Sequence, residues 1–194
     1  MNVTEKKPEK ELFSFIGPDE KKIAIIGCNQ CARMCKTGGP DEVEELKKKL
    51  EEIGKEVVFT FVIDGSCDER LSRIALRKMG EVDCIISMSC GSGNSVIADL
   101  AEVVVYPSNN SLFLGAVKRF GSFDERCSQC GDCVTWRTAG ICPITRCTKG
   151  LLNGGCGGSK DGKCEVEKTR DCAWYMIYER LKKQNRLHYL KSYY

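Results

Sequence analysis

The sequence predicts a mixed α/β fold in two parts: a doubly wound parallel sheet over residues 1–121, and a small cysteine-rich lobe with a C-terminal helix over residues 122–194. Two observations carry this prediction. Short β-branched runs alternate with helical patterns in the first part, which is typical of a parallel sheet with helices on both faces. Beyond Gly121 this periodicity stops, and eight of the 14 cysteines of the chain follow.

Four segments of the first part have the composition of buried strands. They are short, apolar and rich in β-branched or aromatic residues, and Pro107 stops the last of them. An open parallel sheet of consecutive strands and helices indicates a flavodoxin-like domain. The predicted strands are residues 22–27 (KIAIIG), 56–63 (EVVFTFVI), 83–88 (DCIISM) and 102–106 (EVVVY).

Three helical patterns separate these strands. The first begins at Pro40 and ends before Gly54, a residue type that is favoured just past a helix C-terminus. The second covers residues 68–79, and a short third helix covers 95–101. The apolar positions of the first two are Val43, Leu46, Leu50 and Ile53, and Leu71, Ile74, Ala75 and Met79.

The cysteine-rich part has one predicted helix, which begins at Asp171. Its expected buried face consists of Trp174, Ile177, Tyr178 and Leu181. Residues 127–164 are rich in Gly, Cys, Thr and Lys and have too little apolar surface to fold by burial alone. Metal ligation would supply the missing free energy, as it does in other small metal-binding domains.

The bulk composition excludes several classes of protein. A net charge of +3 is too small to predict nucleic-acid binding. No apolar run is long enough to predict a membrane span, and the charged start MNVTEKKPEKELF is unlike a secretory signal. We therefore expect a cytoplasmic protein whose cysteines bind metal. The alternative is a secreted protein held together by disulfides.

The first four cysteines of the second part read C-x2-C-x2-C-x8-C-P. Three thiols three residues apart, with a fourth before proline, are typical of a ferredoxin-like loop around a cubane 4Fe-4S cluster. The x8 spacing departs from the usual x3, so this fourth cysteine closes either the same cluster or a neighbouring one. The ligands of this predicted centre are Cys127, Cys130, Cys133 and Cys142.

Four further cysteines follow in the same lobe. Together with the first four they could hold two cubanes, or one cubane and one zinc ion. Glycines on both sides of Cys156 would let backbone amides approach the sulfurs and tune the reduction potential. The candidate ligands are Cys147, Cys156, Cys164 and Cys172.

A second group of cysteines belongs to the sheet. Cys28, Cys31 and Cys35 follow the first strand, Cys67 follows the second, and Cys90 follows the third in the motif SCGSG. Loops after parallel strands meet at the carboxyl edge, where ligands bind. We therefore expect a further metal centre there, with Cys90 favoured over Cys67 as its fourth ligand. The remaining cysteine, Cys84, lies within a strand and is expected in the core.

The same sheet edge admits a competing interpretation. Gly38-Gly39 and Gly91-Ser92-Gly93 each precede a predicted helix and could present amides to a phosphate or flavin. Neither matches the dinucleotide-binding pattern G-x-G-x-x-G. No nucleophile–base pair stands out, and the single histidine, His188, is expected on the surface.

Several motifs occur together with this cysteine spacing. In order, they are the GICP turn, the loop LLNGGCGG and the helix start DCAW, and upstream of them IIGCNQCARMCKTGG and SCGSG. Over residues 12–188 the chain resembles the MetV-type small subunit of methylenetetrahydrofolate reductase, which contains the cysteine-rich C-terminal domain of that family. One departure is Gly155, where the family pattern has proline.

The resemblance implies an accessory, non-catalytic electron-transfer subunit of one-carbon metabolism (the Wood-Ljungdahl pathway). Its partner in a heterodimer would be the flavin-containing catalytic subunit, and its donor ferredoxin or an electron-bifurcating complex. We expect two to three 4Fe-4S clusters, with zinc as an alternative at one site, and flavin only on the partner. The rival hypotheses are a structural zinc module that docks the reductase, an enzyme with its own flavin, and a redox or metal sensor.

Overall fold

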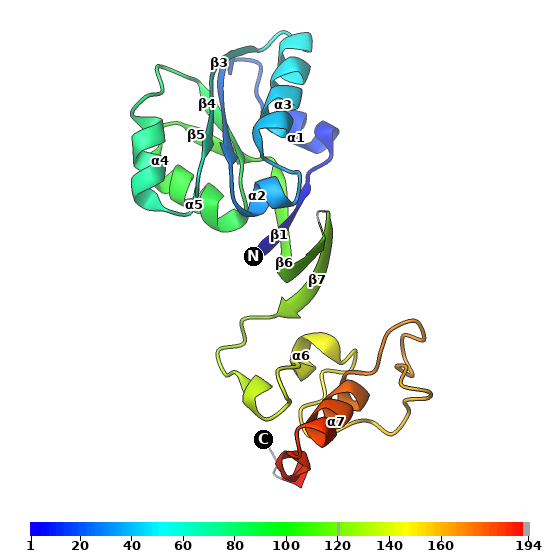
Figure 1. Cartoon of the computed structure of the whole chain (residues 1–194). Helices are drawn as coiled ribbons and strands as arrows, with labels where there is room; N and C mark the ends of the chain where they lie inside the picture. Colours follow the sequence, from blue (N-terminus) through cyan, green and yellow to red (C-terminus); the bar gives the residue numbers. More distant parts are fainter. Residues whose placement is uncertain (120, 192–194) are drawn as a thin grey trace. The chain divides into compact units, whose positions relative to one another are not determined.

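A computed structural model describes residues 1–119 and 121–191 (Figure 1). The chain divides into two compact units. The N-terminal unit comprises Met1–Phe113 and Val117–Phe123, and the C-terminal unit comprises Leu114–Ala116 and Asp124–Tyr194. In the described part of the chain, no helix is long and apolar enough to cross a membrane.

A parallel sheet of four strands forms the centre of the N-terminal unit. The strand order is β3-β2-β4-β5, and every neighbouring pair is parallel. Of the strands in this sheet, β2 comes first along the chain, and it lies between β3 and β4, which come second and third. Flavodoxin-like sheets have the same order. The strands are β2 (Lys22–Cys28), β3 (Glu56–Ile63), β4 (Cys84–Met88) and β5 (Val104–Pro107). The predicted parallel α/β sheet is confirmed.

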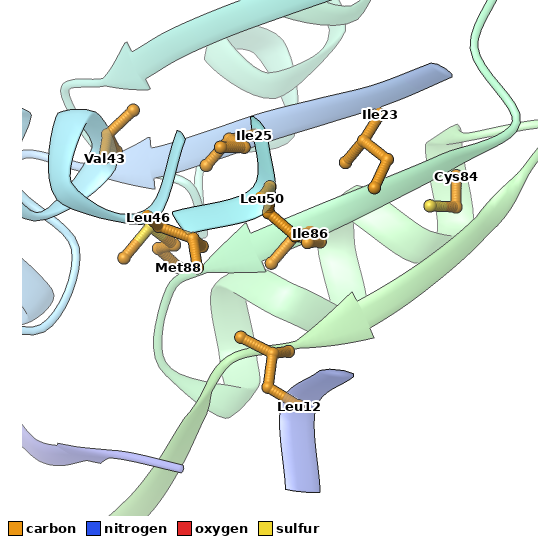
Figure 2. Packing of buried hydrophobic residues seen from close by; sticks show 9 residues of the cluster. All are labelled: Leu12, Ile23, Ile25, Val43, Leu46, Leu50, Cys84, Ile86 and Met88. Carbon is orange, nitrogen blue, oxygen red and sulfur yellow. The ribbon is translucent and has the colours of Figure 1, made fainter. Parts of the chain in front are cut away.

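Helices cover both faces of this sheet. On one face, α1 (Glu9–Phe15) and α3 (Pro40–Glu52) pack on alternate side chains of β2 and β4. Figure 2 shows this core, in which Leu50 lies close to Ile86. On the other face, α4 (Glu69–Leu76) and α5 (Gly91–Leu100) cover the remaining alternate side chains. Successive residues of a strand point to opposite faces, so the continuous apolar runs of β2 and β4 are buried on both sides.

Two helices differ from their sequence-based predictions. Helix α4 is shorter than the predicted 68–79, and its buried residues are Ser72 and Ala75, whereas Leu71 and Ile74 are 37% and 50% exposed. Its Asp68 cap accepts hydrogen bonds from the first-turn amides, which sets the start of the helix. Helix α5 begins at Gly91, four residues earlier than predicted, because the glycine-rich SCGSG motif forms its first turn.

A second sheet and two short helices were not predicted. This sheet has the order β1-β6-β7, with β1 (Asn2–Lys6), β6 (Asn109–Arg119) and β7 (Ser122–Cys127). Gly121 lies between β6 and β7 with φ +78°, a conformation that glycine adopts without strain. Helices α1 and α2 (Cys31–Met34) are the unpredicted helices of the N-terminal unit.

The C-terminal unit has a small core of its own. Helix α7 (Ala173–Lys183) confirms the predicted final helix and buries Trp174, Ile177 and Leu181 against Ile141. Tyr178, which was expected on the same face, is exposed instead. The other short elements are η1 (Val134–Trp136), α6 (Pro143–Arg146) and η2 (Leu187–Lys191).

Candidate metal centres

The N-terminal cysteines gather where β2 and β4 end side by side. Cys28 is the last residue of β2, and Cys90 is the cap residue of α5 just beyond β4. Because β3 and β5 lie outside this pair, the chain reverses its winding direction between β2 and β4. Ligands of open α/β sheets bind at this reversal, in the crevice beyond the carboxyl ends of the strands.

The loop after β2 is folded back tightly on this edge. The Cys28 amide donates to the Gly38 carbonyl at 2.8 Å, and a Cβ on Gly38 would lie 1.8 Å from the Met88 carbonyl oxygen. Only glycine permits such a close approach of two backbone segments. This approach holds Cys31, the first residue of α2, and Cys35, its cap residue, over the sheet edge.

Three of these thiols lie within electrostatic reach of one another. Burial raises the pKa of Cys31, and the thiols of Cys90 and Cys28 raise it further. Cys28 and Cys90 are only 4% and 6% exposed. The three residues come from β2, α2 and α5, so tertiary packing brings together cysteines that are far apart in the sequence.

Cys35 is tied to the same place through strand β1. Its Sγ accepts from the Thr4 amide at 3.4 Å and lies 3.9 Å from the Asn2 carbonyl, to which its thiol donates. The Asn2 backbone also hydrogen-bonds Cys31, and the Asn2 side-chain amide donates to Cys90 Sγ at 3.5 Å.

The other two cysteines of this unit have different environments. Cys67 is exposed in the loop before α4 and follows β3, on the far side of β2 from β4. Cys84 is completely buried at the start of β4, and burial raises the pKa of its thiol to about 12. It packs against Ile23 and Leu50 in the α3-facing core, as the sequence predicted.

The first three C-terminal cysteines lie on an exposed loop. Cys127 ends β7, and Gln129 and Gly131 turn the chain with φ +54° and +86°. The Gln129 amide donates to Cys127 Sγ at 3.4 Å, which begins the N–H···S pattern that cluster loops use. Near Cys133, hydrogen bonds from the Thr135 hydroxyl and backbone lower the pKa of the thiol.

Several cysteines of both units occupy helix N-termini. Cys142 precedes α6, whose first residue is Pro143, and Cys172 precedes the 11-residue helix α7. Cys90 has the same position at the 10-residue helix α5. These cysteines therefore stand where backbone amides of a first helical turn have no partner within the helix.

The remaining C-terminal cysteines surround the small core. Cys147 and Cys172 pack against it, and Cys156 and Cys172 line a cavity of about 340 Å³ that Trp174 also lines. Cys164 lies 3.5 Å from the Thr148 hydroxyl, and this hydrogen bond is the largest cause of its lowered thiol pKa.

Not all predicted ligands are brought together. Within residues 1–119 and 121–191, no three His, Cys, Asp or Glu side chains are arranged so that they could hold a single metal ion. The N-terminal thiols share one sheet edge, whereas the C-terminal cysteines are distributed along loops. The assignment of all 13 cysteines as metal ligands therefore stays a prediction. The structure describes where each cysteine lies and which residues surround it.

The two glycine motifs of the competing anion site are occupied by side chains. The Gly39 amide donates to Glu42 Oε2 at 2.8 Å, so a carboxylate already sits at the N-terminus of α3. The Gly91 amide donates to Ser111 Oγ at 2.8 Å. A phosphate at α3 would meet the charge of Glu42, which disfavours the phosphate or flavin interpretation of this edge.

The sequence pattern does not reveal the contacts of Asn2 and Thr4 with these cysteines, because the start MNVTEKKPEK has the composition of a charged segment. No spacing rule links them to cysteines that lie dozens of residues away. The apolar run LFLGAV of β6 is the one signal that could have revealed a further strand at this point.

A comparison with known families gives one match. Residues 106–194 match a family model described as methylene-tetrahydrofolate reductase C terminal. No curated protein and no solved structure matches the chain. The match covers all eight C-terminal cysteines and begins beyond the N-terminal group. Residues 106–194 are therefore similar to the methylenetetrahydrofolate reductase C-terminal family, as their cysteine spacing and motifs predicted.

Proposed function

We propose that this chain is the accessory iron–sulfur subunit of a methylenetetrahydrofolate reductase complex, and that it passes electrons to or from the flavin of the catalytic subunit. The observation that carries the proposal is the family match over residues 106–194 together with the C-x2-C-x2-C-x8-C-P motif inside it. A second thiol group, at the sheet edge of the other unit, would extend the path of the electrons.

The N-terminal donor set fits a thiolate-bound cubane. Its four proposed ligands are Cys28, Cys31, Cys35 and Cys90, and sulfur ligands select iron–sulfur clusters, zinc or copper(I). When bound, a 4Fe-4S cluster supplies reversible transfer of single electrons. The sheet edge contributes amide donors to three of the sulfurs.

In this proposal, the chemistry on folate takes place on the flavin-bearing partner. The flavin of the partner is the place where single electrons are exchanged for a hydride pair. The role of this subunit is therefore to hold the ligands, to restrict water at buried Cys28 and Cys90, and to present the C-terminal cysteines. The expected partners are the flavin-bearing subunit and a ferredoxin-class or electron-bifurcating donor.

Metal analysis of the anaerobically purified complex tests the proposal. Iron and acid-labile sulfide should be present in amounts for two to three 4Fe-4S clusters, with the broad absorbance at about 400 nm that thiolate-bound clusters give. A colourless, zinc-loaded subunit would overturn the relay and leave the structural zinc module. Flavin released from this chain alone would support an enzyme with its own flavin.

The N-terminal centre has a test of its own. Cys90→Ser should remove one cluster's iron from the complex, whereas the matched change Cys67→Ser should leave the iron content unchanged. In the same preparations, the rate at which a reduced ferredoxin-class donor reduces the partner's flavin should fall only for Cys90→Ser. Equal iron loss in both variants would contradict the assignment of Cys90 as ligand.

A further inference from the structure

Strand β1 brings three hydrogen-bond donors to three different cysteines. The Asn2 backbone bonds Cys31, the Thr4 amide bonds Cys35 at 3.4 Å, and the Asn2 side-chain amide bonds Cys90 at 3.5 Å. These sulfurs are separated along the chain, and β1 is the only strand in the described part of the structure with a hydrogen bond to more than one of them.

The geometry of an edge strand explains this pattern. β1 lies at the edge of its sheet with β6 as its neighbour, and it contacts α2, which contains Cys31. The N–H groups of alternate strand residues point to the same edge. Asn2 and Thr4 are such an alternate pair. Sulfur atoms therefore take the place that a further strand would occupy on this edge.

Buried contacts hold β1 in this position. The hydroxyls of Thr4 and Thr37 lie 2.6 Å apart, and Thr37 also donates to the Ala32 carbonyl of α2 at 3.2 Å. Val3 and Thr4 are 4% and 5% exposed. The strand is thus fixed against the cysteine loop by packing, and its amides are preorganised before any metal binds.

We propose that β1 is a hydrogen-bonding strap that sets the reduction potential of the N-terminal centre. This inference rests on the proposed function. One electron enters the centre on reduction and leaves on oxidation, with no bond formed or broken. The reduced state carries one more negative charge on the sulfurs and metal, so N–H···S bonds stabilise it more than the oxidised state. The strap therefore raises the potential.

The test is an electron-paramagnetic-resonance redox titration of the intact complex. Asn2→Leu removes the side-chain amide without adding charge, and Asn2→Asp replaces it with a carboxylate. We expect the midpoint potential of one centre to become more negative in Asn2→Leu and more negative still in Asn2→Asp. The other centres should keep their potentials. The affected signal is the one that disappears in Cys90→Ser.

Asn110→Leu is the matched control, because it makes the same change in the neighbouring strand β6 at a residue with no sulfur contact among the described residues. Its potentials should equal those of the wild type. An N-terminal centre that is present but unmoved in Asn2→Leu would overturn the strap alone, as would an equal shift in Asn110→Leu. If Cys90→Ser removes no paramagnetic signal from the complex, the proposed N-terminal cluster is wrong, and so is the proposal that β1 sets its potential.

Discussion

The two cysteine groups differ in how the chain holds them. The N-terminal group rests on a parallel sheet, with Cys28 and Cys90 nearly buried and β1 bonded to the sulfurs. In the C-terminal group, Cys127, Cys130 and Cys133 are exposed on a loop next to a core of four buried apolar residues. The scaffold of the first group folds because it buries apolar side chains, whereas the second group has little buried apolar surface to hold it.

This difference indicates two roles for the metal. A site on a preformed sheet edge binds metal without a change in fold, so hydrogen bonds and burial can tune its properties. A loop site with little apolar surface gains its folding free energy from the metal itself. The two groups share one feature, since each places a cysteine at the N-terminus of a helix.

The largest expected effect follows from removing the metal. Metal binding contributes on the order of 10 kcal/mol to small cysteine-bound domains, so the metal-free C-terminal unit should lose its structure while the sheet persists. Hydrogen exchange after oxidative chelation measures this. Amides of residues 128–170 should exchange freely, and those of β2 and β4 should stay protected. Equal loss of protection in both units would contradict the comparison.

Alkylation of thiols in the metal-free chain should show the next largest contrast. Burial raises the pKa of Cys84 from 9.0 to about 12, so its thiolate is about a thousandfold scarcer near neutral pH than that of an ordinary cysteine. Cys133 is exposed on its loop and belongs to the unit that should lose its structure without metal, so its thiol is accessible to the reagent. Mass spectrometry after brief iodoacetamide treatment should find Cys133 modified and Cys84 intact.

The pH dependence of this labelling provides its control. The rate at Cys84 should continue to rise as pH approaches about 12, whereas the rate at Cys133 should level off at a lower pH. In denaturant both residues should react alike. Rapid labelling of Cys84 in the folded chain would show that β4 opens far more readily than a central strand should.

A smaller effect is expected from Gly38→Ala. The added Cβ would lie 1.8 Å from the Met88 carbonyl oxygen, so the loop must move and the free energy of unfolding should fall by about 3 kcal/mol. Urea unfolding of the N-terminal unit measures this. Gly80→Ala is the matched control, because its Cβ would meet nothing within 4 Å. Equal stability of the two variants would refute the tight contact.

Much of the parallel sheet was predictable from the sequence, because continuous apolar runs such as KIAIIG require burial on both faces. The C-terminal helix was predictable for a related reason, since Trp174, Ile177 and Leu181 recur at helical spacing. The face of α4 was predicted only in part. Its apolar Leu71 and Ile74 lie on the exposed side, whereas the predicted Ala75 is buried together with Ser72, which was not predicted, in a helix that packs against α5 and β3.

The sequence by itself determined the strand–helix alternation, the spacing of the C-terminal cysteines and the family of residues 106–194, because these depend on local pattern. The tertiary structure decided which distant residues meet. It placed Cys28, Cys31 and Cys90 at the point where the sheet reverses, left Cys67 exposed, and brought β1 to the sulfurs. Such contacts depend on strand order and on the free edge of β1, and neither is encoded in residues adjacent along the chain.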